Sequence, residues 1–284
     1  MDIYEIITSK IVEELDKGRI PWKKPWKNVE AVSYSTKKPY SLLNQLLLGK
    51  GGEWLTFNQI QENGGHIRKG EKASMVVFWR WLEKEQTVEE DGETKQVKKK
   101  IPFLRYYNVW HIDQCEGITP KTDMALNENI GADKTADELF ADYYEREGIM
   151  VCNGGNEAYY APLLDTITLP HKEQFADLAE YYSTEAHEAV HSTGAEKRLN
   201  RDIKNLFGDK AYSKEELVAE LGSAFILGRL GIDTKDTLKN STAYIQSWKR
   251  KLTEDKYLIV SAASKAEKAT KYIYGELETE EEGE

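Results

Sequence analysis

The sequence predicts an α+β protein of two domains, a small mixed α/β domain followed by a mainly helical domain with a small sheet. Three observations support this. The chain has 284 residues, more than a typical single domain. Its charge differs between the two halves, and residues 118–133 are rich in turn formers and lack periodicity. We therefore expect domains at 1–120 and 134–275, a linker at 121–133 and an acidic tail at 276–284.

The charge is distributed unevenly along the chain. The net charge of −10 taken alone argues against nucleic acid as a partner. However, residues 1–120 hold 19 Lys and Arg against 17 Asp and Glu, whereas residues 121–284 hold 20 against 32. Residues 19–81 are the most basic segment, with 11 basic side chains against 4 acidic ones. The two domains are thus expected to have different partners.

Composition excludes several classes of protein. No uninterrupted apolar run approaches the roughly 20 residues of a membrane helix, so we expect no membrane partner. The start, "MDIYEIITSKIVEELDKG", has helical periodicity and early acidic residues, unlike a secretion signal, which indicates a cytoplasmic protein. Cys115 and Cys152 are too few for a disulfide framework and form no C-x-x-C pair.

The elements of the first domain follow from periodicity and turn residues. After the N-terminal helix, the prolines of "GRIPWKKPWKN" indicate an extended segment. Short helices are expected from about Ser41 and from Thr56 to Glu62, each stopped by glycines. "ASMVVFWRWL" and "IPFLRYYNVW" are β-branched and aromatic runs on either side of a polar segment with an Asp-Gly turn. We expect paired strands with a protruding, mobile hairpin.

The second domain is predicted to be mostly helical. "TADELFADYYEREG" is a helix with a glycine stop, and "AYYAPLLDTITLP" offers two short strands. Further helices are expected from Lys172, Ser213, Ser241 and about Asp255. The tail "ELETEEEGE" is an acidic run that we expect to be disordered.

The segment "TEAHEAVHSTG" contains a pattern that is typical of metal sites. His187 and His191 are four residues apart, so on a helix both imidazoles face the same way at the separation that two ligands of one zinc ion need. Glu188 projects beside them, as in the H-E-x-x-H pattern. An ordinary helix can also carry two histidines at this spacing, so the five residues alone leave a purely structural role open.

An open zinc site has three protein ligands, and the segment "YSKEELVAELGSAFILGRLG" contains candidates for the third. Ser213 and Glu216 form a capping-box pattern, which would give Glu216 a task at the helix start. Glu220 lies one turn further on among apolar residues, where an acid is costly without a partner such as a metal. We therefore expect Glu220 as third ligand, with Glu216 or Glu215 as alternatives.

Such a site predicts metal-dependent hydrolysis. Zinc with three protein ligands keeps a fourth position for water and lowers its pKa to about 7. Glu188 would accept the proton as general base and pass it to the leaving amine of a peptide. An edge strand near Ala158 to Ala161 is a candidate for aligning an extended protein or peptide substrate.

Cations alternate with aromatic rings between Arg19 and Trp81, a combination that holds single-stranded nucleic acid, because cations follow the phosphates while rings stack on bases. The alternative is that the tryptophans are core residues. The predicted contacts are Trp22, Lys23, Lys24, Trp26, Lys27, Arg68, Lys69, Lys72, Arg80 and Arg105, with Tyr106, Tyr107 and Trp110 as further stacking groups.

Several motifs together resemble one family. "YYSTEAHEAVHSTGAEKRLNR", "AYSKEELVAELGSAFI" and "AYIQSWKRKL" are similar to the zincin-type metallopeptidase domain of ArdC antirestriction proteins and related polyvalent proteins of mobile elements. "PWKKPW", "PYSLLNQLLL", "WLTFNQIQENGGHIRKGEK" and "YYNVWHIDQCEG" resemble that family's N-terminal domain, which binds single-stranded DNA. A departure is Ser192, where the family commonly has an aromatic residue.

The resemblance implies an antirestriction protein of a mobile element that binds single-stranded DNA and carries a zinc metallopeptidase site. Two alternatives stay open at this point. The zinc site is architectural and catalytically idle in one of them. In the other, the chain is a general cytoplasmic peptidase whose first domain recruits protein.

Overall fold

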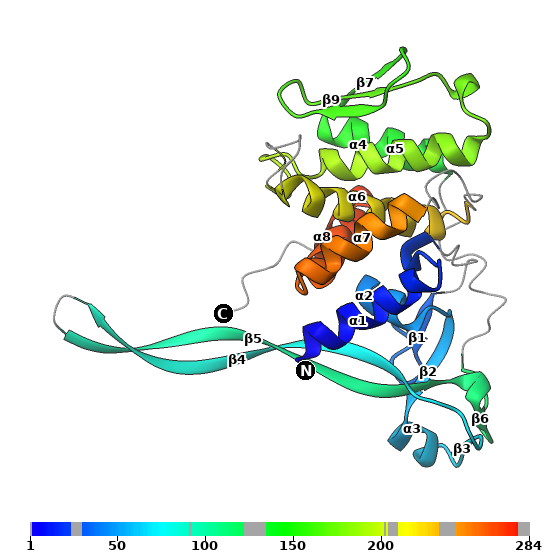
Figure 1. Cartoon of the computed structure of the whole chain (residues 1–284), viewed down its shortest axis with the longest axis vertical. Coiled ribbons are helices and arrows are strands. Elements are labelled where there is room, and N and C mark those ends of the chain that lie inside the picture. The colour runs from blue at the N-terminus through cyan, green and yellow to red at the C-terminus, as the bar shows by residue number, and fades with distance from the viewer. Residues whose placement is uncertain are drawn as a thin grey trace.

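The computed structural model describes residues 2–23, 30–90, 93–121, 135–201, 203, 210–232 and 242–277. Within these ranges, the side chains of residues 23, 79–90, 93–103 and 210–213 are not described. Residues 122–133 of the predicted linker and residues 278–284 of the predicted tail lie outside the described part of the chain. The predicted α+β class is confirmed: a sheet-containing N-terminal part precedes a mainly helical part with a small sheet (Figure 1).

The N-terminal sheet has the strand order β1-β2-β5-β4, with β1 and β2 parallel and the other pairs antiparallel. The β4 and β5 strands form the predicted hairpin, which extends away from the rest of the molecule (Figure 1). Pairing continues through the polar segment from Ser74↔Val109 to Glu90↔Glu93. The strands are β1 (Ala31–Ser33), β2 (Gly52–Thr56), β4 (Ser74–Glu90) and β5 (Glu93–His111), and a separate pair is β3 (His66–Ile67) with β6 (Cys115–Glu116).

Helices α1 (Ile3–Asp16), α2 (Leu42–Leu48) and α3 (Phe57–Glu62) begin close to the predicted positions. The Asp2 carboxylate accepts from the Glu5 backbone N–H at 2.9 Å, and the Glu5 carboxylate accepts from that of Asp2 at 3.0 Å, which satisfies two amides at the start of α1. Thr56 and Gln59 make the same reciprocal arrangement at α3. Helix α2 ends at Gly49, whose φ of 58° lies in the left-handed region that glycine tolerates best.

The C-terminal part contains helices and a three-stranded sheet of order β7-β9-β8. Two strands were expected there and β7 was missed; β7 pairs parallel to β9, and β8 pairs antiparallel to it. The expected helix at Lys172 is only a short 3₁₀ turn, and α5 begins after Asp177, whose carboxylate caps it. The elements are α4 (Ala136–Glu147), β7 (Met150–Asn153), β8 (Tyr159–Ala161), β9 (Thr166–Leu169), α5 (Leu178–Ser192), α6 (Lys210–Arg229), α7 (Thr242–Glu254) and α8 (Leu258–Ile273).

One connected core joins the two parts. Buried apolar side chains of α1 and α2 belong to the same cluster as those of α7 and α8. The Leu42 N–H at the start of α2 donates to the Glu267 carboxylate of α8 at 3.1 Å, and Thr8 of α1 donates its hydroxyl to the Lys256 carbonyl at 2.9 Å. The predicted boundary therefore marks a change in the kind of element but no break in the core. Among the described residues, no helix has the length and apolarity needed to cross a membrane.

Candidate metal centre

Two imidazoles converge where α5 faces α6. The Nε2 atoms of His187 and His191 are 3.1 Å apart, and the two rings are inclined by 79°. The structure thus places both histidines on one face of a helix, as the four-residue spacing predicts. Two lone pairs repel each other at this distance unless a proton or a metal ion lies between them.

Glu216 of α6 completes the group. Its Oε2 atom is 3.6 Å from Nε2 of His187, and its Oε1 atom is 3.3 Å from Nε2 of His191. One ligand atom from each of the three residues lies within 4.8 Å of the other two. Two imidazoles and one carboxylate are the donor set of an open zinc site, in which each atom lies about 2.0 to 2.2 Å from the ion. The residues therefore fit a divalent metal.

Glu220, expected as the third ligand, is not part of this group of described residues. That expectation depended on a capping box at Ser213, which would have occupied Glu216. Helix α6 instead begins at Lys210, so Glu216 lies within the helix and its carboxylate is directed at α5. Glu220 lies one turn further on, where it interacts electrostatically with the Tyr244 hydroxyl. The geometry favours Glu216 over Glu220.

The electrostatics of the group favour a positive charge at its centre. Burial disfavours a charged imidazole, but the nearby carboxylates of Glu215 and Glu216 outweigh it and raise the pKa of His191 to about 9. Burial would also raise the pKa of Glu216, yet the two histidines lower it well below its usual range.

Glu215, which was the other alternative to Glu220, lies beside a candidate metal-binding residue, His191. Its Oε1 atom is 3.4 Å from Nδ1 of His191, on the opposite side of the ring from the metal position. The same carboxylate accepts from Nε of Arg201 at 3.1 Å and from Nη2 at 2.7 Å. Arg201 also donates to the Val190 carbonyl at 2.8 Å and to the Thr193 hydroxyl at 2.7 Å. A carboxylate in this position fixes the orientation of a metal-binding imidazole. No spacing rule connects Arg201 to the H-E-x-x-H pattern, so the sequence held no signal for it.

Close contact between α5 and α6 brings Glu216 within reach of the histidines. A Cβ atom on Gly222 would lie 2.8 Å from Cγ2 of Val190, so only glycine lets the two helices approach this closely. Gly194, just after α5, is similarly crowded: a Cβ there would lie 2.7 Å from Ile203 and 3.2 Å from Nη2 of Arg201. The missing side chains thus allow the centre to assemble.

Glu188 follows His187 directly and is 8% exposed. Its negative charge contributes to the raised pKa of His191. Ser192, at the position where the family commonly has an aromatic residue, is fully buried. Its hydroxyl is 2.9 Å from the Tyr143 hydroxyl and donates to the Ala189 carbonyl at 2.7 Å. A tyrosine from α4 thus packs against the end of α5.

Strand β8 lies at an edge of the small sheet and contacts α5. The turn after it is fastened to the segment after α5 through Arg198, whose side chain is fully buried. Arg198 pairs with Asp165, donates to the Tyr160 hydroxyl at 3.0 Å and donates to the Ser192 carbonyl at 2.7 Å. The edge strand is thus held beside the helix that carries the histidines.

The predicted nucleic-acid contacts divide into three groups. Trp22 is buried and its indole packs edge-on against Trp248, so the prediction that it stacks on bases is wrong. Lys24, Trp26 and Lys27 lie outside the described residues, as do the side chains of Lys23 and Arg80. The exposed ones are Arg68, Lys69, Lys72 and Arg105, together with Tyr106 and Tyr107.

Arg68 is partly engaged within the protein. Its guanidinium donates to the Asp113 carbonyl and lies 3.5 Å from the Glu71 carboxylate. Arg105 lies directly opposite Phe78 in the β4–β5 register, so both side chains are on the same face of the sheet.

Comparisons with known proteins agree in both parts of the chain. Residues 1–110 match the N-terminal domain of anti-restriction factor ArdC, and residues 134–265 match a zincin-like metallopeptidase family. The chain is 31% identical to the uncharacterized protein y4eC of Sinorhizobium fredii, covering 97% of this chain and 92% of that protein. It is also 31% identical to DNA primase TraC of Escherichia coli, covering 95% of this chain but only 20% of the length of TraC.

Two solved structures are similar over nearly the whole chain. Both are crystal structures of the antirestriction protein ArdC from plasmid R388. The metal-free form has a TM-score of 0.75 and 33% identity, and the Mn(II)-bound form has a TM-score of 0.74 and 32% identity. Each comparison covers 97% of this chain and 98% of the other. With a zincin-like centre following an ArdC-type N-terminal domain, this chain belongs to the ArdC family of antirestriction proteins.

Proposed function

We propose that this protein is a metal-dependent peptidase that also binds single-stranded DNA and acts in antirestriction. The convergence of His187, His191 and Glu216 carries the peptidase part of the proposal, and Glu188 follows His187 directly in α5. We take zinc as the resident ion, because two imidazoles and a carboxylate with an open position suit it. The Mn(II)-bound structure of the R388 relative supports the binding of a divalent metal in this family.

A divalent ion held by these ligands would supply Lewis acidity and would lower the pKa of a water molecule at the open position to about 7. The protein's own part begins at Glu188, whose carboxylate accepts a proton from the attacking water and transfers it to the departing amine nitrogen. Glu215 and Arg201 keep the His191 ring oriented while this happens. The free edge of β8 pairs with an extended peptide and aligns its backbone beside α5.

Metal analysis of matched glutamate variants tests the ligand set. The purified full-length protein is expected to hold about one zinc ion per chain. Glu216→Gln is expected to lose most of it, because an amide oxygen is a weaker ligand than a carboxylate. Glu220→Gln, an identical change one turn further along α6, is expected to keep it. The reverse pattern would assign the third ligand to Glu220, and metal-free wild-type protein would refute the site.

DNA binding is the second part of the proposal. Its support is the exposed side chains of Arg68, Lys69, Lys72, Arg105 and Tyr107 on a domain that matches the N-terminal domain of ArdC.

Protection of incoming DNA then results either from coating the strand or from cleaving a host protein. Transfer of unmodified DNA into a restricting host distinguishes the two. Protection that persists in a Glu188→Gln variant with normal metal content favours coating, and its loss favours hydrolysis.

A further inference from the structure

A groove of about 440 Å³ opens on the N-terminal sheet. It lies between the loop that follows β1, the start of α3, and one face of strands β4 and β5. Its volume falls within the range of about 300 to 1,000 Å³ that is usual for small-molecule sites. The buried side chains of Val76 and Val109 are part of its lining, so it is supported by a packed core.

Three aromatic rings line this groove. The Tyr40 and Phe78 centroids are 6.3 Å apart, and those of Phe78 and Tyr107 are 5.6 Å apart at an angle of 70°. Phe78 is 44% exposed and Tyr107 is 47% exposed, although both belong to a sheet that buries neighbouring side chains. Adjacent, half-exposed rings in a hollow are typical of a binding surface and unusual for a bare exterior.

The charge around the rings is positive. Lys38 lines the groove, and Arg105 lies opposite Phe78 on the same face of the sheet. No aspartate or glutamate is among the groove's described lining residues. A ligand that fits therefore combines a flat ring with a negative charge.

Both side-chain amides that line the groove make hydrogen bonds within the protein. The Asn44 side chain exchanges two hydrogen bonds with the Val77 backbone, at 2.8 and 2.7 Å. The Gln59 amide oxygen accepts from the Thr56 backbone N–H at 2.9 Å. With these amides engaged, we expect recognition to rest mainly on the aromatic rings and on charge.

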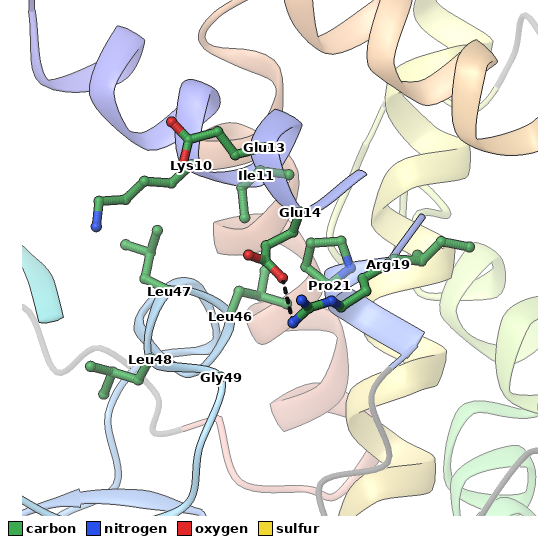
Figure 2. Close-up of a pocket in the computed structure, with 11 residues that line it drawn as sticks. Lys10, Ile11, Glu13, Glu14, Arg19, Pro21, Leu46, Leu47, Leu48 and Gly49 are labelled. Atoms are coloured by element: carbon green, nitrogen blue, oxygen red, sulfur yellow. Dashed lines mark ion pairs between the residues drawn. The ribbon is translucent and has the colours of Figure 1, made fainter. Parts of the chain in front are cut away.

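Another hollow, of about 300 Å³, lies between α1 and the C-terminal end of α2 (Figure 2). Aliphatic side chains and charges of both signs line it, including Arg19, whose guanidinium is 3.5 Å from the Glu14 carboxylate. Its described lining contains no aromatic ring. It offers no surface for stacking, whereas the groove on the sheet does.

We propose that the groove holds one unstacked base of single-stranded DNA, with its ring against Phe78 and Tyr107. Lys38 and Arg105 contact the phosphates on either side of that base. Tyr40 closes the groove from the loop after β1. The inference rests on the proposed DNA-binding function and assigns its base-contacting site. Because stacking tolerates any base, the site shows little sequence preference.

The test compares full-length wild type with the double variant Phe78→Ala/Tyr107→Ala. Tyr106→Ala is the matched control, since Tyr106 is the adjacent residue on β5, is 53% exposed and points to the opposite face. The probes are a fluorescent oligothymidine and a strand of equal length made of abasic sites, followed by fluorescence anisotropy. If the alanine variant does not fold, Phe78→Leu/Tyr107→Leu keeps most of the apolar volume but removes both ring faces.

Wild type is expected to bind oligothymidine more tightly than the abasic strand. The double variant should lose about tenfold or more in affinity for oligothymidine, keep its affinity for the abasic strand, and retain its metal. Tyr106→Ala should behave as wild type. The proposal is overturned if the double variant binds oligothymidine as well as wild type, or weakens equally on both strands. If wild type binds neither strand, the DNA-binding function itself fails.

Discussion

The metal centre and the aromatic groove hold their functional groups in opposite ways. His191 and Glu216 are packed between two helices in contact, and the Glu215 carboxylate, itself paired with Arg201, lies behind the imidazole. The side chains of Phe78 and Tyr107 are instead about half exposed on strands of the sheet. A metal ion requires fixed ligand positions, whereas a sequence-tolerant DNA site needs open faces and nearby cations. The two sites should therefore respond differently to substitution.

The sharpest separation of the two sites should come from Glu188→Gln. Loss of the proton acceptor is expected to reduce peptide hydrolysis by about 100- to 10,000-fold, while zinc content and oligonucleotide affinity stay unchanged. Hydrolysis is measured on fluorescently labelled casein, and binding by anisotropy. Undiminished cleavage by this variant would mean that Glu188 is not the general base.

A smaller loss of function is expected from Glu215→Gln. This change removes the carboxylate beside Nδ1 of His191 but leaves all the proposed metal ligands in place. Zinc affinity should fall by about 10- to 100-fold, as measured by competition with a chelating indicator. Circular dichroism checks that the variant folds, because Arg201 loses its ionic partner. Glu220→Gln is the control and should bind zinc as wild type does. Equal affinity in the Glu215 variant would remove this residue from the centre.

Gly222→Ala tests the close contact between α5 and α6, because its methyl group would meet Val190. Alanine favours a helix by about 1 kcal/mol over glycine, but overpacking a core costs about 1 to 3 kcal/mol, so a net loss of up to about 2 kcal/mol is expected. Urea unfolding measures it. Adding Val190→Ala provides room for the new methyl group and should recover part of the overpacking cost. A single variant as stable as wild type would show that the helices can move apart.

The smallest effect is expected on the DNA-binding side, from Lys69→Ala/Lys72→Ala. Both side chains are exposed. The slope of log affinity against log salt concentration should decrease by about 0.7 for each phosphate contact removed, with hydrolysis unaffected. Lys265→Ala/Lys268→Ala removes two exposed lysines of α8 and should leave the slope as it is. A slope unchanged by the first pair would place the strand elsewhere.

Local patterns predicted most of the elements and two of the three candidate metal ligands. Capping residues such as Thr56 and the spacing of His187 and His191 act within one or two helical turns, so the sequence alone reveals them. The hairpin was predictable for the same reason, because its two strands are joined by a turn signal.

The third candidate ligand, the burial of Trp22 and strand β7 depend on contacts between segments that are distant in the sequence. The Ser213–Glu216 pattern is typical of a helix start, but a cap contributes only about 1 kcal/mol to stability. Helix α6 begins earlier, at Lys210, so Glu216 is not needed at the helix start. The basic, aromatic surroundings of Trp22 in the sequence are typical of a base-stacking residue. In the fold, its indole is buried against Trp248 of α7, which is distant in the sequence. Strand β7 is four residues long and is recognisable mainly through its pairing with β9.

The core shared by α1, α2, α7 and α8 has a consequence for how the protein can be divided. A fragment that ends near residue 121 would expose to water the apolar sides of α1 and α2 that now contact α7 and α8. Such a fragment is prone to aggregate, and its complement loses the same cover. The halves are therefore best compared by substitutions in the intact chain, since each acts as part of the other's interior.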